Sequence, residues 1–306
     1  MIGIYGANGF IGRHLTVRLA RAGRPVKAVS RRFDREFCRN LPSNVECVET
    51  DISHSIQIVS SLREVDTVVD LIGTSSPALG NSHMVSDITE NVIPHIQLLE
   101  ECVRSGVQRF IFISSGGSVY GSTSSTQASE STPTRPISSH GLTKLTVEKY
   151  IQMFGAVYGL EYAILRLTNP YGPGQEFRRN QGLIPAVLYY WKRGMPVTIF
   201  GDGNASRDYI FIEDAIDAIE ATIGSRERLG DIINIGSGET RTVLDVIRDI
   251  ERIKQITIEK RFVAARSTDV SSVRLDTTLA KSRLKWWPKT SFEDGIAKTL
   301  ASFSLF

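Results

Sequence analysis

The chain has 306 residues, which exceeds one average domain and allows a large core with a smaller appended part. Hydrophobic residues make up 41% and charged residues 23%, and 36 basic side chains against 33 acidic ones give a net charge of +3. Nucleic-acid-binding proteins concentrate basic residues on one face, whereas here they are scattered, so we expect no nucleic-acid partner. No apolar run reaches the roughly 18 residues that span a bilayer, so we expect no membrane partner.

The three cysteines, Cys38, Cys47 and Cys102, form no close pair and lack the spacing of metal ligands. We therefore expect neither a disulfide nor a bound metal, which suits the reducing cytoplasm. The N-terminus also lacks the basic region of a secretory signal, so a cytoplasmic protein is predicted.

The segment IGIYGANGFIG places three glycines directly after an apolar strand, Ile2–Tyr5, and before a helix that ends near residue 22. Glycines let the backbone turn sharply and approach a pyrophosphate, and the start of a helix favours its negative charge. Strand, turn and helix together predict a Rossmann-type dinucleotide site rather than a plain strand-to-helix turn. The expected cofactor residues here are Gly6, Asn8, Gly9, Phe10, Ile11 and Gly12.

The end of the second expected strand, Val26–Ser30, is where this fold places an acidic residue that holds the ribose of NAD. The chain has Ser30, Arg31 and Arg32 instead. A guanidinium binds the 2′-phosphate of NADP, which a carboxylate would repel, so we expect NAD(P) as the cofactor, with a preference for NADP. The alternative is that these arginines are ordinary solvated side chains.

Further strands are expected at 45–49, 67–72, 110–114 and 162–167, separated by helices that include 88–104 and 142–154. Apolar stripes on these two helices indicate either core or a helix-to-helix dimer face. The alternation predicts an α/β fold, a doubly wound parallel Rossmann sheet covered by helices on both faces.

Beyond residue 172 the pattern becomes irregular, with a helix near 183–191 and a strand at 197–200. A strand at 209–212, a helix and a strand at 232–235 read as a return to the first sheet. We therefore assign 1–172 and 205–236 to the dinucleotide-binding domain, and 173–204 and 237–306 to a second, smaller substrate-binding domain.

Seven motifs in order carry a resemblance to a known family: GANGFIG, SSGGSVYG, GLTKLTVEKY, RLTNPYGPG, RDYIFIED, NIGSG and ARSTDV. Over its whole length the chain resembles the extended short-chain dehydrogenase/reductase family, in the nucleotide-sugar epimerase and dehydratase branch typified by UDP-galactose 4-epimerase. The resemblance implies a nucleotide-sugar substrate, a homodimer, and a cofactor held further by Asp51, Ile52, Leu71, Ile72, Gly73, Asn91, Lys144 and Leu167.

The resemblance also implies a substrate site. Asn169, Arg207 and Arg266 match positions that grip the diphosphate of a UDP-sugar, and Asp208 would orient its neighbour Arg207. A valine at position 273 would leave room for an N-acetyl group on the sugar. The remaining substrate positions are Ser75 and Asp269, with Leu183, Ile184, Ile199, Phe200 and Val273 around the base and sugar.

The chain departs from the family at two catalytic positions. The family tyrosine of YxxxK is His140, four residues before Lys144, so both would lie on one helix face. The family Ser or Thr is Gly116, and Ser118, two residues along an extended segment, would supply the hydroxyl instead. An imidazole is a permissible base, although it reaches less far than a phenol and a nearby ammonium weakens it.

Three functions compete at this point. The first is a nucleotide-sugar 4-epimerase that acts on a UDP-hexose or UDP-N-acetylhexosamine through a 4-keto intermediate. The second is an NADPH-dependent 4-keto nucleotide-sugar reductase, favoured by the arginines after the second strand. The third is a catalytically silent NADP-binding protein, suggested by Gly116 and His140.

Overall fold

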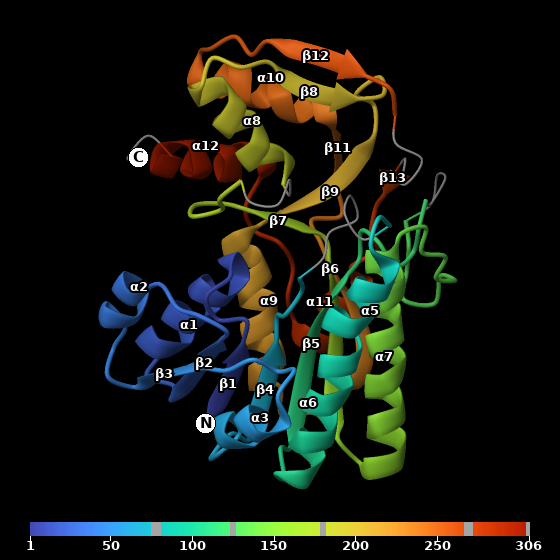
Figure 1. The fold of residues 1–306 in the computed structure, drawn as a ribbon. Coiled ribbons are helices and arrows are strands. Elements are labelled where there is room, and N and C mark those ends of the chain that lie inside the picture. Colours follow the sequence, from blue (N-terminus) through green and yellow to red (C-terminus); the bar gives the residue numbers. More distant parts are fainter. Residues whose placement is uncertain (75–80, 123–126, 178–181, 266–271, 304–306) are drawn as a thin grey trace.

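The computed structural model describes residues 1–74, 81–122, 127–177, 182–265 and 272–303 (Figure 1). Its main layer is a sheet of seven parallel strands in the order β10-β6-β5-β4-β1-β2-β3. The predicted α/β fold with a parallel sheet is therefore confirmed. The strands are β1 Ile2–Tyr5, β2 Val26–Ser30, β3 Val45–Glu49, β4 Thr67–Asp70, β5 Arg109–Ser115, β6 Glu161–Leu167 and β10 Gly230–Ile235.

Helices cover both faces of this sheet because successive side chains of a strand point to opposite sides. In β5, Phe110 and Phe112 pack with α3, α6 and α7, whereas Ile111 and Ile113 pack in the core that contains α1 and α9. The helices are α1 Phe10–Arg21, α2 Arg35–Arg39, α3 Ser55–Ser61, α5 Met84–Asn91, α6 Ile93–Arg104, α7 Ser139–Tyr158 and α9 Ile212–Gly224.

The strand order reverses at β1. The chain runs outward through β2 and β3 on one side and continues with β4 on the other. Ligands of doubly wound proteins bind outside the carboxyl ends of the strands at such a point. The topology therefore places a site between the ends of β1 and β4.

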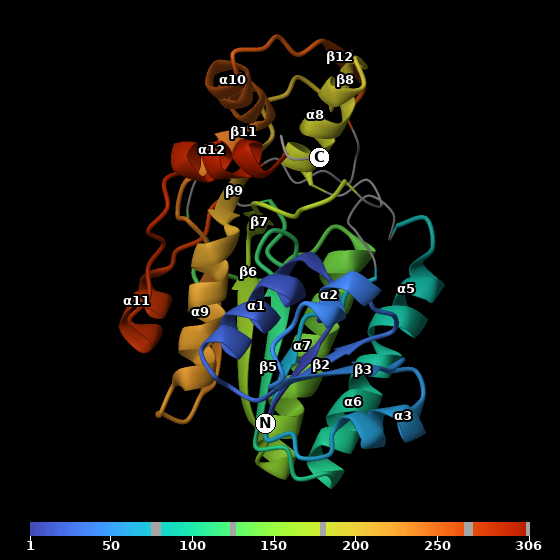
Figure 2. The ribbon, with the colours of Figure 1, turned by 90° about the vertical axis from the view of Figure 1, so that its left-hand side faces the viewer.

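Smaller sheets lie above these strand ends together with α8, α10 and α12, whereas α11 packs beside α9 and β10 (Figures 1 and 2). Strand β9 pairs with β7, β11 and β13, and β8 pairs with β12. Only the second of the two strands expected to return to the large sheet does so, because β10 pairs with β6 while β9 joins the smaller sheet. The domain boundaries stay a prediction. The elements are β7 Asn169–Tyr171, β8 Val197–Phe200, β9 Ser206–Phe211, β11 Thr240–Thr242, β12 Lys260–Val263, β13 Ser272–Val273, α8 Leu183–Lys192, α10 Val243–Lys254, α11 Thr278–Leu284 and α12 Phe292–Phe303.

The single helix expected at 88–104 is two helices, α5 and α6, that meet at Val92. Pro94 in the first turn of α6 has no amide hydrogen to donate, and its ring clashes with the preceding turn of a continuous helix. The interruption turns α5 away from α6, toward the upper part of the molecule.

The expectation that no cysteines pair is wrong for Cys38 and Cys47, which form a disulfide. The chain reverses between α2 and β3, and this brings their Cα atoms to 6.5 Å although nine positions separate them in sequence. Cys102 is free and buried. In the described part of the chain, no helix has both the length and the apolar character that crossing a membrane requires.

Candidate cofactor and substrate site

The glycine turn between β1 and α1 needs glycine at particular positions. Gly6 has φ +88°, and a Cβ added to Gly12 would lie 2.3 Å from the Gly6 carbonyl oxygen. Gly9 is the N-cap of α1 and provides no side-chain cap, and the first turn of α1 carries no acidic residue. The opening of this helix therefore suits a pyrophosphate, which backbone amides and the helix dipole would hold.

A cavity of about 480 Å³ lies next to this turn, at the carboxyl ends of β1 to β4. A dinucleotide fits the chemistry of its wall, which combines the glycine turn with polar groups at the ends of β2 and β3. Nine of the expected cofactor residues line it: Gly6, Gly9, Ser30, Arg31, Asp51, Ile52, Leu71, Ile72 and Gly73.

Seven other residues line the cavity that were not predicted from the sequence. Thr50 and Ser53 flank Asp51 and Ile52, and Thr74 follows Gly73. Because they adjoin predicted residues, these three could have been predicted from the sequence. Thr89, Glu90 and Pro94 come from α5 and α6, and a helix that bends over the cavity gives no local sequence signal. The complete missed set is Val29, Thr50, Ser53, Thr74, Thr89, Glu90 and Pro94.

Other expected cofactor residues shape the site without lining this cavity. Asn91 Oδ1 accepts from the Thr74 amide (2.9 Å), which fixes the chain after β4. Asn8 accepts from Arg13 Nη2 (2.8 Å) and donates to the Arg32 carbonyl (3.1 Å), which ties the glycine turn to the segment after β2. Phe10, Ile11, Gly12 and Leu167 lie in α1 and at the end of β6.

A second, polar cavity adjoins the first. It is lined by Ser30, Arg31 and Arg32 together with Glu49 and residues that follow β3. Both arginines are exposed. Asp51 lines both cavities, and the Ser53 backbone amide, which donates to its carboxylate (3.0 Å), lowers the pKa of Asp51. This carboxylate is therefore charged near pH 7.

Lys144 lies beside the first cavity. Its Nζ donates to the carbonyls of Ile72 (3.1 Å) and Ile113 (2.9 Å), and a Cβ on Gly73 would lie 3.9 Å from it. Nζ also lies 4.4 Å from the centre of the Phe112 ring, a cation–π distance. Burial lowers the pKa of Lys144 to about 8, so the group is mostly charged at neutral pH.

His140 lies one helical turn before Lys144, in the first turn of α7, where Ser138 is the N-cap. Burial is the main cause that lowers the pKa of His140 to about 4, and repulsion by the Lys144 ammonium adds to it. The imidazole is therefore neutral at physiological pH and able to accept a proton, but it is a weak base.

The reason given for Ser118 does not hold in the structure. Strand β5 ends at Ser115, and residues 116–118 form a turn in which the Ser118 amide donates to the Ser115 carbonyl (3.3 Å). The alternation of an extended strand therefore does not apply. A Cβ at Gly116 would lie 2.6 Å from Leu275 Cδ1, so a serine there requires Leu275 to move. A catalytic role for Ser118 stays a prediction.

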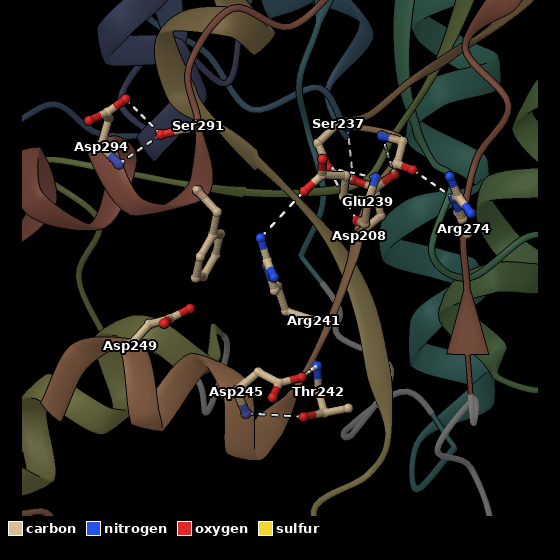
Figure 3. Close-up of polar contacts among 12 residues, drawn as sticks. Asp208, Ser237, Glu239, Arg241, Thr242, Asp245, Asp249, Arg274, Ser291 and Asp294 are labelled. Carbon is tan, nitrogen blue, oxygen red and sulfur yellow. Dashed lines mark hydrogen bonds and ion pairs between the residues drawn. The ribbon is translucent and has the colours of Figure 1, made fainter. Parts of the chain in front are cut away.

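Residues expected at the substrate's diphosphate come from two neighbouring strands. Asn169 on β7 donates to the Asp208 carbonyl (2.8 Å), and Arg207 on β9 donates to the Ser206 carbonyl (2.8 Å). The sequence predicts that Asp208 orients Arg207, but the hydrogen bonds described for its carboxylate join it elsewhere: it accepts from the Ser237 amide (2.8 Å) and the Gly238 amide (3.1 Å) (Figure 3). These bonds anchor the loop after β10. Successive side chains of a strand point to opposite faces, so Asp208 and Arg207 point away from each other on β9.

The residues expected around the base and sugar differ in exposure. Ile184, Ile199 and Val273 are buried in apolar clusters, Leu183 is half-buried, and Phe200 is 37% exposed. Ser75, Arg266 and Asp269 lie outside the described residues. Contact of these side chains with a nucleotide stays a prediction.

We predict a pH profile set by His140 and Lys144. For kcat/KM, which reports the protein without substrate, we expect a flat rate from about pH 5 to 7, because the predicted base is the deprotonated form of His140 and its pKa is about 4. Above about pH 8 the rate should fall as Lys144 loses its proton. Initial rates across buffered pH check this, and an acidic limb near pH 6.5 would contradict it, since that is the value of a histidine in water.

The family described as "NAD dependent epimerase/dehydratase family" matches residues 2–236. The chain is 30% identical to dTDP-4-dehydro-6-deoxyglucose reductase of Escherichia coli, across 98% of this chain and 96% of that protein. It is also similar to the crystal structure of UDP-glucose 4-epimerase from Thermotoga maritima with UDP-glucose (TM-score 0.92, 31% identity, 99% and 98% of the chains). The crystal structure of the Thermus thermophilus UDP-glucose 4-epimerase complex with NAD gives the same TM-score of 0.92, with 27% identity over 99% of this chain and 98% of that one.

Proposed function

Because the chain belongs to the NAD dependent epimerase/dehydratase family, we propose that it is an NAD(P)-dependent nucleotide-sugar 4-epimerase, with a UDP-hexose or UDP-N-acetylhexosamine as substrate and a 4-keto intermediate. The observation that carries the proposal is the position of Lys144 and His140. They lie one turn apart at the start of α7, and Lys144 donates a hydrogen bond to the carbonyl of Ile72, which lines the first cavity.

The main polar groups expected at the site then have roles in the proposed reaction. A bound nicotinamide would supply the hydride acceptor and donor. Neutral His140 would accept the proton of the C4 hydroxyl and return it after the sugar has turned over, and the Lys144 ammonium would bind the nicotinamide ribose and keep His140 neutral. Asn169, Arg207 and Arg266 would hold the diphosphate, whose two charges match guanidinium groups.

The test is to incubate the protein with UDP-glucose and, separately, with UDP-N-acetylglucosamine, without added coenzyme and with NAD⁺ or NADP⁺. The C4 epimer is expected in the proton NMR spectrum of at least one mixture. Lys144→Met, which keeps the length of the side chain and removes its charge, should lower the rate at least about 100-fold. Absence of an epimer in every mixture would contradict the proposal.

His140→Tyr separates an enzyme with an altered base from a silent binding protein. A large gain in the rate of epimer formation would mean that the rest of the site is competent. Activity in neither protein, together with coenzyme binding in both, would indicate a binder.

The second candidate is an NADPH-dependent 4-keto nucleotide-sugar reductase. It is favoured by the similarity over nearly the full chain to the E. coli reductase and by Arg31 and Arg32 at the second cavity. This reading predicts stoichiometric oxidation of NADPH, seen as loss of its near-ultraviolet absorbance, when a 4-keto nucleotide sugar is added. Unchanged NADPH absorbance would contradict the reductase function.

We propose that NADP is preferred over NAD, with its 2′-phosphate in the second cavity. Replacing Arg31 and Arg32 with alanine should raise the Kd for NADP⁺ at least about tenfold, which is the loss of one hydrogen bond to a charged group. The Kd for NAD⁺ should change little. Arg35→Ala and Arg39→Ala, on exposed positions of α2 outside both cavities, are the matched controls. Tighter binding of NAD⁺ by the native chain in calorimetric titration would refute the preference.

We also propose a homodimer formed through α5 and α7. These neighbouring helices expose Val85 (77%) and Val157 (64%), along with Ile88, Leu142 and Met153. Of the apolar stripes predicted on the helices at 88–104 and 142–154, Leu99 and Phe154 lie in the core, which is one of the two alternatives given for those stripes. Val85→Asp combined with Val157→Asp should convert a dimer to a monomer in light scattering, whereas Ile56→Asp on α3 should not. A native chain that is monomeric would contradict this.

A further inference from the structure

The Lys144 ammonium rests on a peptide group that a buried acid holds in place. Asp70, fully buried at the end of β4, accepts the Ile72 amide on its Oδ1 (2.9 Å). The carbonyl of the same residue, Ile72, accepts from Lys144 Nζ (3.1 Å). The Asp70 carboxylate therefore fixes the peptide group after β4 to which the Lys144 ammonium is hydrogen-bonded.

The second carboxylate oxygen of Asp70 is unusual. Oδ2 is buried and, among the described residues, has no hydrogen-bond partner, although His95 Nε2 lies 3.3 Å away. His95 is itself buried, and desolvation lowers its pKa, so the imidazole is neutral near pH 7 and does not balance the charge. A buried carboxylate oxygen without a partner is costly and calls for an explanation.

The titratable groups around Lys144 come from three elements: Asp70 on β4, His95 on α6, and Glu148 and His140 on α7. Glu148 already forms a bidentate pair with Arg166, in which Nη2 and Oε2 are 2.6 Å apart. Asp70 is the larger of the two influences that favour the charged form of Lys144. The attraction that acts on Lys144 therefore comes mainly from Asp70, which also acts on the neighbouring His95.

We propose that Asp70 is a positioning residue for Lys144: its buried carboxylate fixes the Ile72 peptide group and supplies the negative charge that keeps the ammonium protonated beside the cofactor cavity. The neutral His95 ring packs edge-to-face on Phe112 (centroids 5.8 Å apart), whose face lies against Lys144, and so closes the cluster from α6. The importance of this role for catalysis rests on the proposed function, but the electrostatic effect itself does not.

The test measures the titration of Lys144 in the protein without coenzyme or substrate. Lysine labelled with ¹³C and ¹⁵N reports the ammonium by NMR, and Lys144→Arg assigns its signal. In Asp70→Asn, which keeps an acceptor for the Ile72 amide but removes the charge, the midpoint should fall by at least about one pH unit. Asp66→Asn, an exposed acid just before β4, should leave the midpoint unchanged.

Asp70→Ser is the second variant, in case the asparagine protein does not fold, and the same downward shift is expected. A midpoint equal to that of the native protein in either folded variant overturns the role of Asp70. An absence of epimerase activity in the native protein would instead count against the proposed function, because the lysine titration needs no turnover. In an active protein, the alkaline limb of the pH profile should move with the midpoint.

Discussion

Gly12→Ala is expected to weaken binding of the dinucleotide at least about 100-fold. The added Cβ would lie 2.3 Å from the Gly6 carbonyl oxygen and 2.7 Å from Ala7 Cα, so the backbone of the turn has to move. Losing two hydrogen bonds from amides to phosphate, at about 1.5 kcal/mol each, corresponds to this factor. Calorimetric titration with NAD⁺ and NADP⁺ measures it.

Gly224→Ala is the matched control, because its Cβ would have no heavy atom within 4 Å and its φ is not positive. This variant should bind both coenzymes as the native chain does. Circular dichroism establishes that the Gly12 variant is folded. A folded Gly12→Ala protein with native affinity would show that the turn does not hold the pyrophosphate.

Glu148→Ala is expected to reduce the free energy of unfolding by about 3 to 5 kcal/mol, the usual effect of leaving one charge of a buried pair alone. Glu148 is fully buried and Arg166 is 2% exposed, and Ser114 Oγ donates to the same carboxylate (2.5 Å). Without Glu148, the partner that remains to the guanidinium within the described residues is Tyr120, through its hydroxyl (2.9 Å) and the face of its ring (4.8 Å). Urea denaturation at pH 7 measures the loss.

Two further variants control this experiment. Glu293→Ala removes an exposed partner of Arg252 and should change stability little, because surface pairs are screened by water. Glu148→Ala combined with Arg166→Met should recover part of the lost stability, since no unpaired charge remains buried. A double variant that is less stable than Glu148→Ala would contradict the electrostatic explanation.

The parts of the fold that depend on local pattern could be predicted from the sequence. Short apolar runs set β1, β2 and β3 at the expected residues, and the glycine turn follows β1 directly. Pro94 could have divided the predicted helix at 88–104, because the residue type alone carries that signal. The regular spacing of apolar residues across 88–104 instead favoured one continuous helix.

Contacts between residues far apart in the chain could not be predicted in the same way. Arg166 belongs to an apolar strand, and its pairing with Glu148 appears only when α7 packs on β6, while Tyr120 reaches it from the segment after β5. Asp70 and His95 also meet through packing, and no spacing rule links them. The disulfide between Cys38 and Cys47 depends on the turn between α2 and β3, whose geometry the sequence does not specify.

At the site, motif positions identified the residues better than argument from periodicity. Nine of the expected cofactor residues line the cavity; the resemblance predicted five of them, and the glycine turn and the end of the second strand predicted the other four. Ser118 was expected to share a face with position 116 because an extended strand was predicted there, but β5 ends at Ser115 and the chain turns at Gly116 and Gly117. For His140, the expected repulsion by Lys144 is present, but burial is the larger cause of its lowered pKa, and burial is not visible in a sequence.

The most direct test of the proposed epimerase uses a UDP-hexose or UDP-N-acetylhexosamine carrying deuterium at C4. Mass spectrometry and deuterium NMR of the product in ordinary water follow the label. We expect the C4 epimer with its deuterium retained, because the same hydrogen leaves the sugar and returns to it. No epimer, or an epimer whose deuterium has been replaced from the solvent, would contradict the account.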